Sequence, residues 1–253
     1  MKKINIFDIN TYPRELETIR KKTILLFENN VEFLKENQTD LFRIFGQYAN
    51  ISSNPMATLI NEIKTILNCN NIVCFHNTRV LNIESIKKNG LMFPINGYKE
   101  RIIIDLKNNN IASDIIKMIS SSIDNILSSF INDPIMIEKH KQICFYMNIN
   151  DYNTYSNFYN IYGRELLKQA LTNLSIDDSI KNKILSFGIP YIIEFYFPFN
   201  LIEKYKQDEI IISLLLLWIK KYILKSNNID KNIDGRIIHE IPKENIIKII
   251  TLD

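Results

Sequence analysis

A change of hydrophobic periodicity at Asn71 limits the folds that this sequence can adopt. Through most of residues 1–68, apolar residues recur every three or four positions, which is the spacing of amphipathic helices. Beyond Asn71 they gather in short runs rich in β-branched and aromatic side chains, separated by further helical patterns. The predicted strands are 71–77, 143–148, 189–197, 235–242 and 245–252. Because strands and helices do not alternate regularly, the sequence predicts an α+β fold and not a doubly wound parallel sheet.

The N-terminal segment is expected to form a helical layer. Its last helix has Ser53 or Asn54 as a cap and Pro55 in its first turn, a typical helix start. We expect a helical region at 1–70 that packs on a domain at 71–253. The most apolar run, 210–219, is too short to cross a bilayer, so it is expected to be a buried core helix and no membrane association is expected.

The composition is that of an ordinary folded protein, with 46% hydrophobic and 23% charged residues. A net charge of +3 favours neither a nucleic acid nor an anionic ligand. Cys69, Cys74 and Cys144 form no Cys-x-x-Cys pair, and the first residues lack the continuous apolar segment of a signal peptide. Free thiols and a cytoplasmic location are therefore expected.

The stretch "CFHNTRVLNIESIKKNGL" (74–91) contains the most informative set of candidate functional residues. We expect His76 to lie at the end of its strand, where a sheet meets a cleft. The helix that follows has Asn82 as a candidate cap and Glu84 in its first turn, where the helix dipole favours a negative charge. Gly90 can supply the positive φ angle that ends the helix, and Leu91 follows it. Strand, His-x-Thr-Arg, helix and Gly-Leu are thus expected to form one rigid unit.

This string resembles the first motif of the ADP-ribosyltransferase-like superfamily. That group includes diphtheria-toxin-like and poly-ADP-ribosylating enzymes, bacterial DNA-modifying toxins and tRNA 2′-phosphotransferases. The resemblance implies split antiparallel β-sheets that form a cleft for NAD, here with the helical layer at the N-terminus. It also implies that NAD is the substrate and that residues 71–253 are the catalytic domain.

The resemblance assigns roles to individual residues. It implies that His76 bonds a ribose hydroxyl, that the backbone at Asn77 holds the nicotinamide amide, and that Thr78 completes the motif. Arg79 is a candidate pyrophosphate contact, since its planar guanidinium suits a phosphate. The aromatic residue that stacks on nicotinamide in the second family motif is matched by Tyr146 or, on the opposite face of its strand, by Phe145; Tyr146 is favoured because its hydroxyl tolerates a polar cleft.

Two glutamates compete for the catalytic role. Glu240 is expected late in a strand, before a final Ile-rich strand like the closing block of the superfamily. A carboxylate there can stabilise the oxocarbenium-like centre formed when the nicotinamide–ribose bond breaks. Glu165 belongs to the string Tyr162-Gly163-Arg164-Glu165, which resembles an aromatic-Gly-x-Glu string of bacterial proteins with a similar first motif. Tyr162 and Glu165 are therefore candidate cleft residues. Glu194, on a third strand, ranks last.

The leading interpretation is an NAD-dependent ADP-ribosyltransferase that modifies a macromolecular acceptor, as a bacterial toxin or phage-defence effector with a possible cognate inhibitor or antitoxin. Protein, DNA and RNA acceptors remain open. The alternative is a catalytically inactive nucleic-acid- or protein-binding module on the same fold, for which the aromatic run at 152–162 suits base stacking. Phosphate transfer from RNA to NAD would need more basic residues than Arg79 around the first motif. No His, Cys and Asp spacing is that of a metal site, so no metal is expected.

Overall fold

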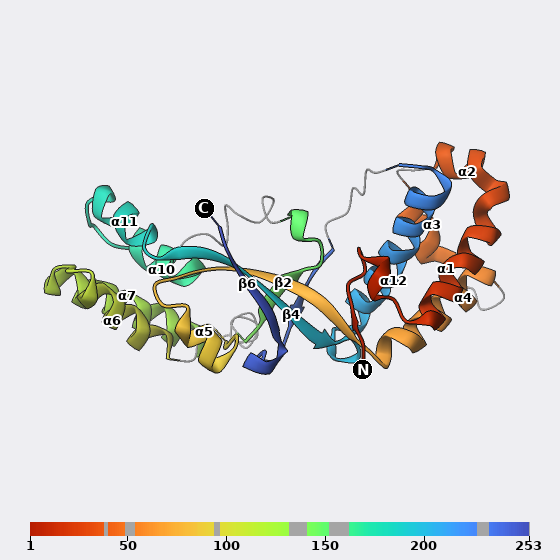
Figure 1. Ribbon diagram of the computed structural model, residues 1–253. Helices are drawn as coiled ribbons and strands as arrows, with labels where there is room; N and C mark the ends of the chain where they lie inside the picture. The colour runs from red at the N-terminus through yellow and green to blue at the C-terminus, as the bar shows by residue number, and fades with distance from the viewer. Residues whose placement is uncertain are drawn as a thin grey trace. The chain divides into compact units, whose positions relative to one another are not determined.

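The protein has an α+β fold, as the sequence predicts (Figure 1). The computed structural model describes residues 1–37, 40–48, 54–93, 97–131, 141–151, 162–226 and 233–252. Within these residues, no helix is long and apolar enough to cross a membrane.

The strands of the described residues form a single six-stranded sheet in the order β5-β3-β2-β4-β6, with β1 paired to β2 in parallel. The strands are β1 (Lys3–Ile4), β2 (Asn71–Val80), β3 (Ile143–Tyr146), β4 (Ile189–Pro198), β5 (Asp234–Ile237) and β6 (Ile246–Thr251). β4 and β6 are antiparallel, with Ile193 opposite Ile249. β2 and β4, each ten residues long, lie at the centre of this sheet, with β3 beside β2 and β6 beside β4.

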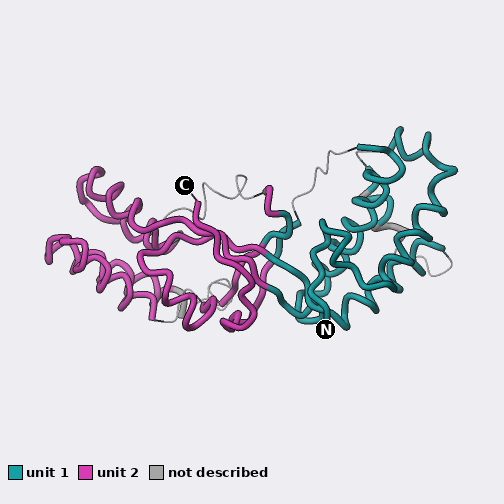
Figure 2. The backbone as a smooth tube through the Cα atoms, in the orientation of Figure 1, with its two compact units in different colours: residues 1–74, 146–148, 196–235 teal, residues 75–145, 149–195, 236–253 magenta. Residues whose placement is uncertain are grey.

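The chain divides into two compact units (Figure 2). Unit 1 comprises residues 1–74, 146–148 and 196–235, and unit 2 comprises 75–145, 149–195 and 236–253. The expected boundary between residues 70 and 71 lies close to the end of the first segment of unit 1. Residues 196–235 join that unit because the helix α12 packs against three N-terminal helices.

Unit 1 is mainly helical. Its described helices are α1 (Arg14–Phe27), α2 (Val31–Glu36), α3 (Leu41–Tyr48), α4 (Pro55–Asn68) and α12 (Lys204–Trp218). Asn54 caps α4 by accepting the N–H of Met56, and Pro55 is its first residue, as predicted. α12 is buried along most of its length and ends in a π-helical turn at Ile219–Ile223, which confirms the predicted core helix.

Within the described residues, unit 2 has a core of four helices, α6 (Tyr98–Asn108), α7 (Ser113–Ile131), α10 (Arg164–Thr172) and α11 (Asp178–Leu185). The short helix α5 (Glu84–Asn89) contacts the 3-10 turn at Lys243–Asn245. α7 lies beside α6 (Figure 1) and also contacts α10. Its buried residues include Ile119 and Ile123. This packing places α6 beside the residue pair Tyr162–Gly163, which precedes α10.

Candidate functional site

The strand–helix–Gly-Leu unit of the first motif forms largely as predicted, and its residues from Phe75 onward belong to unit 2. The side chain of Asn82 accepts the backbone N–H of Glu84 at 2.9 Å at the start of α5. Gly90 ends the helix with a φ angle of +82°. Leu91 and Ile241 exchange backbone hydrogen bonds of 2.8 and 2.9 Å. The first motif is therefore tied directly to the segment that carries Glu240.

The prediction that His76 lies at the end of its strand is wrong, because β2 continues to Val80. His76 is 2% exposed, and its Nδ1 lies 2.7 Å from the carbonyl oxygen of Cys144 on β3. A carbonyl oxygen can only accept, so Nδ1 carries the proton in this bond. Asn77 and Thr78 are also buried. The polar string is typical of a strand end in sequence, but it belongs to a central strand, where the bond to β3 satisfies the buried His76.

Arg79 holds the end of β2 to the segment after α11. Its Nε donates to the carbonyl oxygen of Phe187 at 2.9 Å, and its Nη2 donates to that of Ser186 at 3.1 Å. The same segment accepts the backbone N–H of Tyr162 at the carbonyl of Leu185, at 3.0 Å. The end of α11 thus fixes both the last part of the first motif and the start of the Tyr-Gly-Arg-Glu string.

A cavity of about 310 Å³ lies among these elements of unit 2. Its wall comprises the end of β2 from Thr78, the helices α5 and α6, the residues Gly90 to Met92, and the pair Tyr162–Gly163. Most of the wall is apolar, and a few polar groups converge on it, as in typical small-molecule sites. Of the eight residues that the sequence proposed, Thr78, Arg79 and Tyr162 line this cavity. Its described lining does not include His76, Asn77, Tyr146 or Glu240.

The polar corner of the cavity is built around Tyr162, which is 3% exposed. Its hydroxyl donates a short hydrogen bond to Oδ2 of Asp105. Burial, and then the bond to Asp105, raise the pKa of Tyr162 well above its ordinary value. The phenol therefore stays protonated and remains a donor at neutral pH. The hydroxyl of Tyr98 donates another short bond to the carbonyl of Gly163, which ties α6 to the turn before α10.

Glu240 lies at the edge of this region and not in a strand, so that part of the prediction is wrong. β5 ends at Ile237, since Ile241 pairs with Leu91 and Pro242 has no N–H with which to extend a ladder. Oε1 of Glu240 accepts the backbone N–H of Phe93 at 3.1 Å. Phe93 directly follows Met92, a residue of the cavity wall. The side chain of Glu240 is exposed.

The remaining candidates are less informative. Glu165 lies in the first turn of α10, after Gly163 with its φ of +70°, but its side chain is outside the described residues. Tyr146 and Phe145 are both buried, and Tyr146 belongs to unit 1. Glu194 lies opposite Lys248 in the β4–β6 register. The aromatic run at 152–162 lies outside the described residues except for Tyr162.

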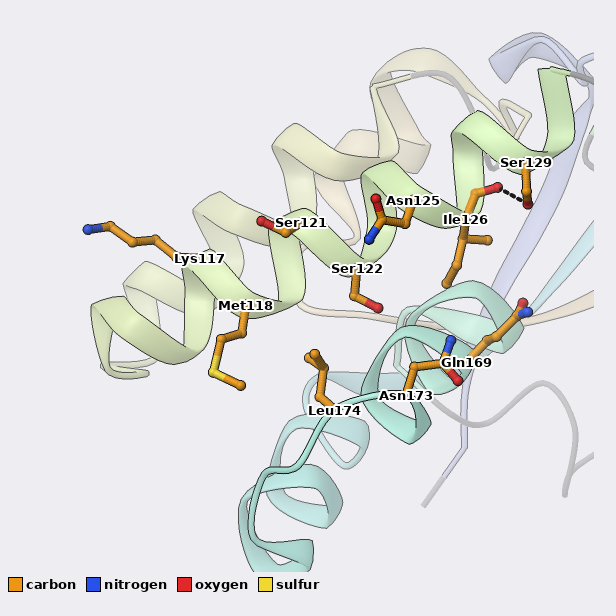
Figure 3. A pocket seen from close by; sticks show the side chains of 10 residues that line it. All are labelled: Lys117, Met118, Ser121, Ser122, Asn125, Ile126, Ser129, Gln169, Asn173 and Leu174. Carbon is orange, nitrogen blue, oxygen red and sulfur yellow. Dashed lines mark hydrogen bonds between the residues drawn. The ribbon is translucent and has the colours of Figure 1, made fainter.

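A second pocket of about 670 Å³ lies between α7 and the end of α10 (Figure 3). Its polar lining is hydroxyl and amide groups, among them Ser121, Asn125, Gln169 and Asn173, and its charged lining residue is Lys117. Ser122 and Ser129 donate to backbone carbonyls of Ala170 and Ile126. With no carboxylate or histidine among its described lining residues, this pocket offers no acid–base pair, so the smaller cavity is the better catalytic candidate.

Metal binding and catalysis by a cysteine thiolate have little support in the described part of the chain. No group of three or more His, Cys, Asp or Glu side chains there could hold a metal ion. The described cysteines are free thiols, and burial raises the pKa of the Cys74 thiol, which disfavours the nucleophilic thiolate.

No protein-family model, curated protein or solved structure matches the chain significantly. The assignment of a function therefore depends on the geometry of the cavity and on the resemblance of its motifs.

Sequence reasoning missed the contribution of α6. Tyr98, Arg101 and Asp105 all line the cavity, yet they lie in a segment without a recognised motif. Their spacing of three and four residues was the available signal, because it places them on one face of a helix. That face also carries the buried Ile102, so the polar residues looked like part of an ordinary amphipathic pattern.

Proposed function

We propose that the protein is an NAD-dependent ADP-ribosyltransferase with an ADP-ribosyltransferase-like catalytic fold. The observation that carries the proposal is that two motif blocks far apart in sequence line one cavity. Thr78 to Leu91 of the first motif and Tyr162–Gly163 of the aromatic-Gly-x-Glu string share its wall, and Glu240 is bonded to the residue after Met92.

The proposed reaction breaks the bond between nicotinamide and C1′ of the ribose. C1′ joins a nucleophile of the acceptor, which loses its proton, and nicotinamide leaves as a neutral molecule. The positive charge that develops on the ribose requires a nearby carboxylate. Glu240 is the first candidate, because its backbone is fixed by the Leu91–Ile241 bridge beside the cavity wall. Glu165 is the second.

His76 acts in this proposal as a positioning residue. Its buried bond to β3 holds the strand that leads to Thr78 and Arg79. The acceptor is proposed to be a macromolecule, in keeping with a bacterial toxin or phage-defence effector that a cognate inhibitor or antitoxin would restrain. The catalytically inactive binding module becomes the conclusion if no NAD chemistry is found.

The test is nicotinamide release from NAD labelled in its adenosine half, with a mixed pool of protein, DNA and RNA as acceptors. Glu240→Gln keeps the shape of the side chain and removes its charge, and loss of such stabilisation typically lowers kcat by about 100-fold or more. Glu244→Gln, four residues later and also exposed, is the matched control and is expected to retain activity. The labelled fraction of the pool identifies the acceptor class.

Three outcomes decide among the alternatives. Glu165→Gln is measured in the same way. Loss of nicotinamide release in Glu240→Gln alone supports the proposal with Glu240 as the catalytic residue. Loss of nicotinamide release in Glu165→Gln alone assigns that role to the Tyr-Gly-Arg-Glu string. Absence of nicotinamide release in the unaltered protein with every acceptor rejects the transferase and leaves the binding module.

A further inference from the structure

The helix α6 gives the cavity two charged side chains of opposite sign. Arg101 and Asp105 are four residues apart, hence on one face of the helix, and both line the cavity. Asp105 is half-buried beside Tyr162, whereas Arg101 is exposed. The cavity therefore has a fixed acceptor in its polar corner and a cationic donor where it opens to solvent.

Asp105 is held in place as an acceptor. The phenol of Tyr162 donates to Oδ2, and an ionised carboxylate has about four acceptor positions on its two oxygens. The bond to Tyr162 thus orients the carboxylate while leaving it capable of accepting more than one donor. Neighbouring hydroxyl groups, such as those of a ribose, suit an acceptor of this kind.

Arg101 suits an anion. A guanidinium carries five N–H donors in a planar fork that matches a phosphate, so it can bind one while it holds another partner. The rest of the wall is largely apolar, with Ile102 and Leu91 buried in it and Met92 and Ile104 partly exposed. Such a wall can accept a flat heterocycle.

We propose that the cavity binds a phosphorylated ribonucleoside, the nicotinamide mononucleotide half of NAD, with the ribose hydroxyls on Asp105 and the phosphate on Arg101. The choice of nicotinamide as the base rests on the proposed function, whereas the roles of the two charged residues rest on the cavity itself. A volume of about 310 Å³ lies at the lower end of typical ligand pockets, which suits a mononucleotide better than a complete dinucleotide.

The test is calorimetric binding of nicotinamide mononucleotide and of nicotinamide riboside, which lacks the phosphate, to the full chain. The mononucleotide is expected to bind about tenfold more tightly, because a charge-assisted hydrogen bond to phosphate is strong. Arg101→Ala is expected to remove this difference by weakening only the mononucleotide. Asp105→Asn is expected to weaken both ligands by a similar factor, since both contain the ribose.

Two control variants remove a positive and a negative charge, as Arg101→Ala and Asp105→Asn do, but at residues outside the cavity lining. Lys107→Ala removes an exposed positive charge from the same helix, and Asp114→Asn removes an exposed negative charge from α7. Both are expected to bind like the unaltered protein. Should Asp105→Asn fail to fold, as judged by thermal unfolding, the exposed Arg101 decides the outcome alone.

Equal binding of the two ligands, or an equal effect of Arg101→Ala and Lys107→Ala, overturns the inference. Failure of both ligands to bind also overturns it, and nicotinamide release from NAD by the same preparation then shows whether the proposed function survives. Mononucleotide binding that depends on Arg101, without any nicotinamide release, supports the site and rejects the transferase.

Discussion

His76 is placed to stabilise the sheet, and its replacement should be measured first as a change in stability. Truncation to alanine removes the bond to the Cys144 carbonyl and leaves a gap in a site that is 2% exposed. We expect His76→Ala to lower the free energy of unfolding by about 3 kcal/mol, as for other large-to-small changes at buried, hydrogen-bonded positions. Urea unfolding followed by circular dichroism measures the loss.

The exposed His239 provides the comparison. His239→Ala is expected to change the free energy of unfolding by less than about 0.5 kcal/mol, which is usual for surface positions. A His76→Ala protein of unchanged stability that no longer releases nicotinamide would contradict the structural role. It would return His76 to the ribose contact that its motif implies.

At the scale of elements, Gly90 controls how the first motif joins the Glu240 segment. A Cβ atom added to Gly90 would lie 2.0 Å from the carbonyl oxygen of Ile241, and the φ angle of +82° disfavours any L side chain. The loss combines backbone strain with a steric clash, so we expect Gly90→Ala to lower the free energy of unfolding by about 3 kcal/mol. The clash is with backbone, so the Leu91–Ile241 bridge must open and Glu240 must move.

Gly97→Ala separates these two causes. Gly97 also has a positive φ angle, +59°, but an added Cβ there meets no described atom within 4 Å. We therefore expect it to cost only the conformational strain, about 1 kcal/mol. Chemical denaturation of both variants checks the difference, and similar losses in the two would show that the close approach to Ile241 is unimportant.

The elements themselves were more predictable than their ends and their partners. The hydrophobic pattern predicts α4 because its apolar residues recur at helical spacing, and it predicts α12 because a continuous apolar run is buried on all sides. β4 is predicted by its β-branched and aromatic residues. The pattern does not predict the end of β2, because Asn77 and Thr78 are polar yet buried, and only pairing with neighbouring strands can show that. The pattern also predicts a strand at Glu240, because the residues around it do not show that Ile241 pairs with Leu91.

In the candidate site, too, residues within motifs could be predicted from sequence, whereas a residue defined by a long-range contact could not. Thr78, Arg79 and Tyr162 belong to motifs and could be proposed from sequence, and they do line the cavity. Asp105 could not, because its importance comes from Tyr162, which is 57 residues away in the chain. A single sequence contains no measure of such a long-range contact.

For the whole molecule, two buried tyrosines predict a loss of stability at alkaline pH. Tyr12 in unit 1 and Tyr162 in unit 2 both have their pKa raised in the folded protein, chiefly by burial. In the unfolded chain a tyrosine titrates near pH ~10. The contribution of the neutral phenols to stability is therefore complete below that pH. It declines above it, as the unfolded state alone loses protons.

Each tyrosine should make the free energy of unfolding fall by up to about 1.4 kcal/mol per pH unit above the ordinary tyrosine pKa. Tyr12→Phe and Tyr162→Phe should each flatten the decline, although both lose a hydrogen bond at every pH. The indole N–H of Trp218, the single tryptophan, donates to the hydroxyl of Tyr12 in unit 1, so tryptophan fluorescence reports unfolding there. Amide hydrogen exchange in α6 and α10 reports unfolding of unit 2.

The two probes make the prediction specific to each unit. Between about pH 9 and about pH 11, Tyr12→Phe should reduce the alkaline loss seen by fluorescence, and Tyr162→Phe should reduce the loss seen by exchange in α6. An alkaline decline that persists unchanged in the double variant would show that groups other than these two phenols cause it, such as the Cys74 thiol, whose pKa is also raised by burial. Because the Tyr162 hydroxyl donates to Asp105, a flattened decline in α6 would show that the polar corner of the cavity contains a neutral phenol that can act as this donor.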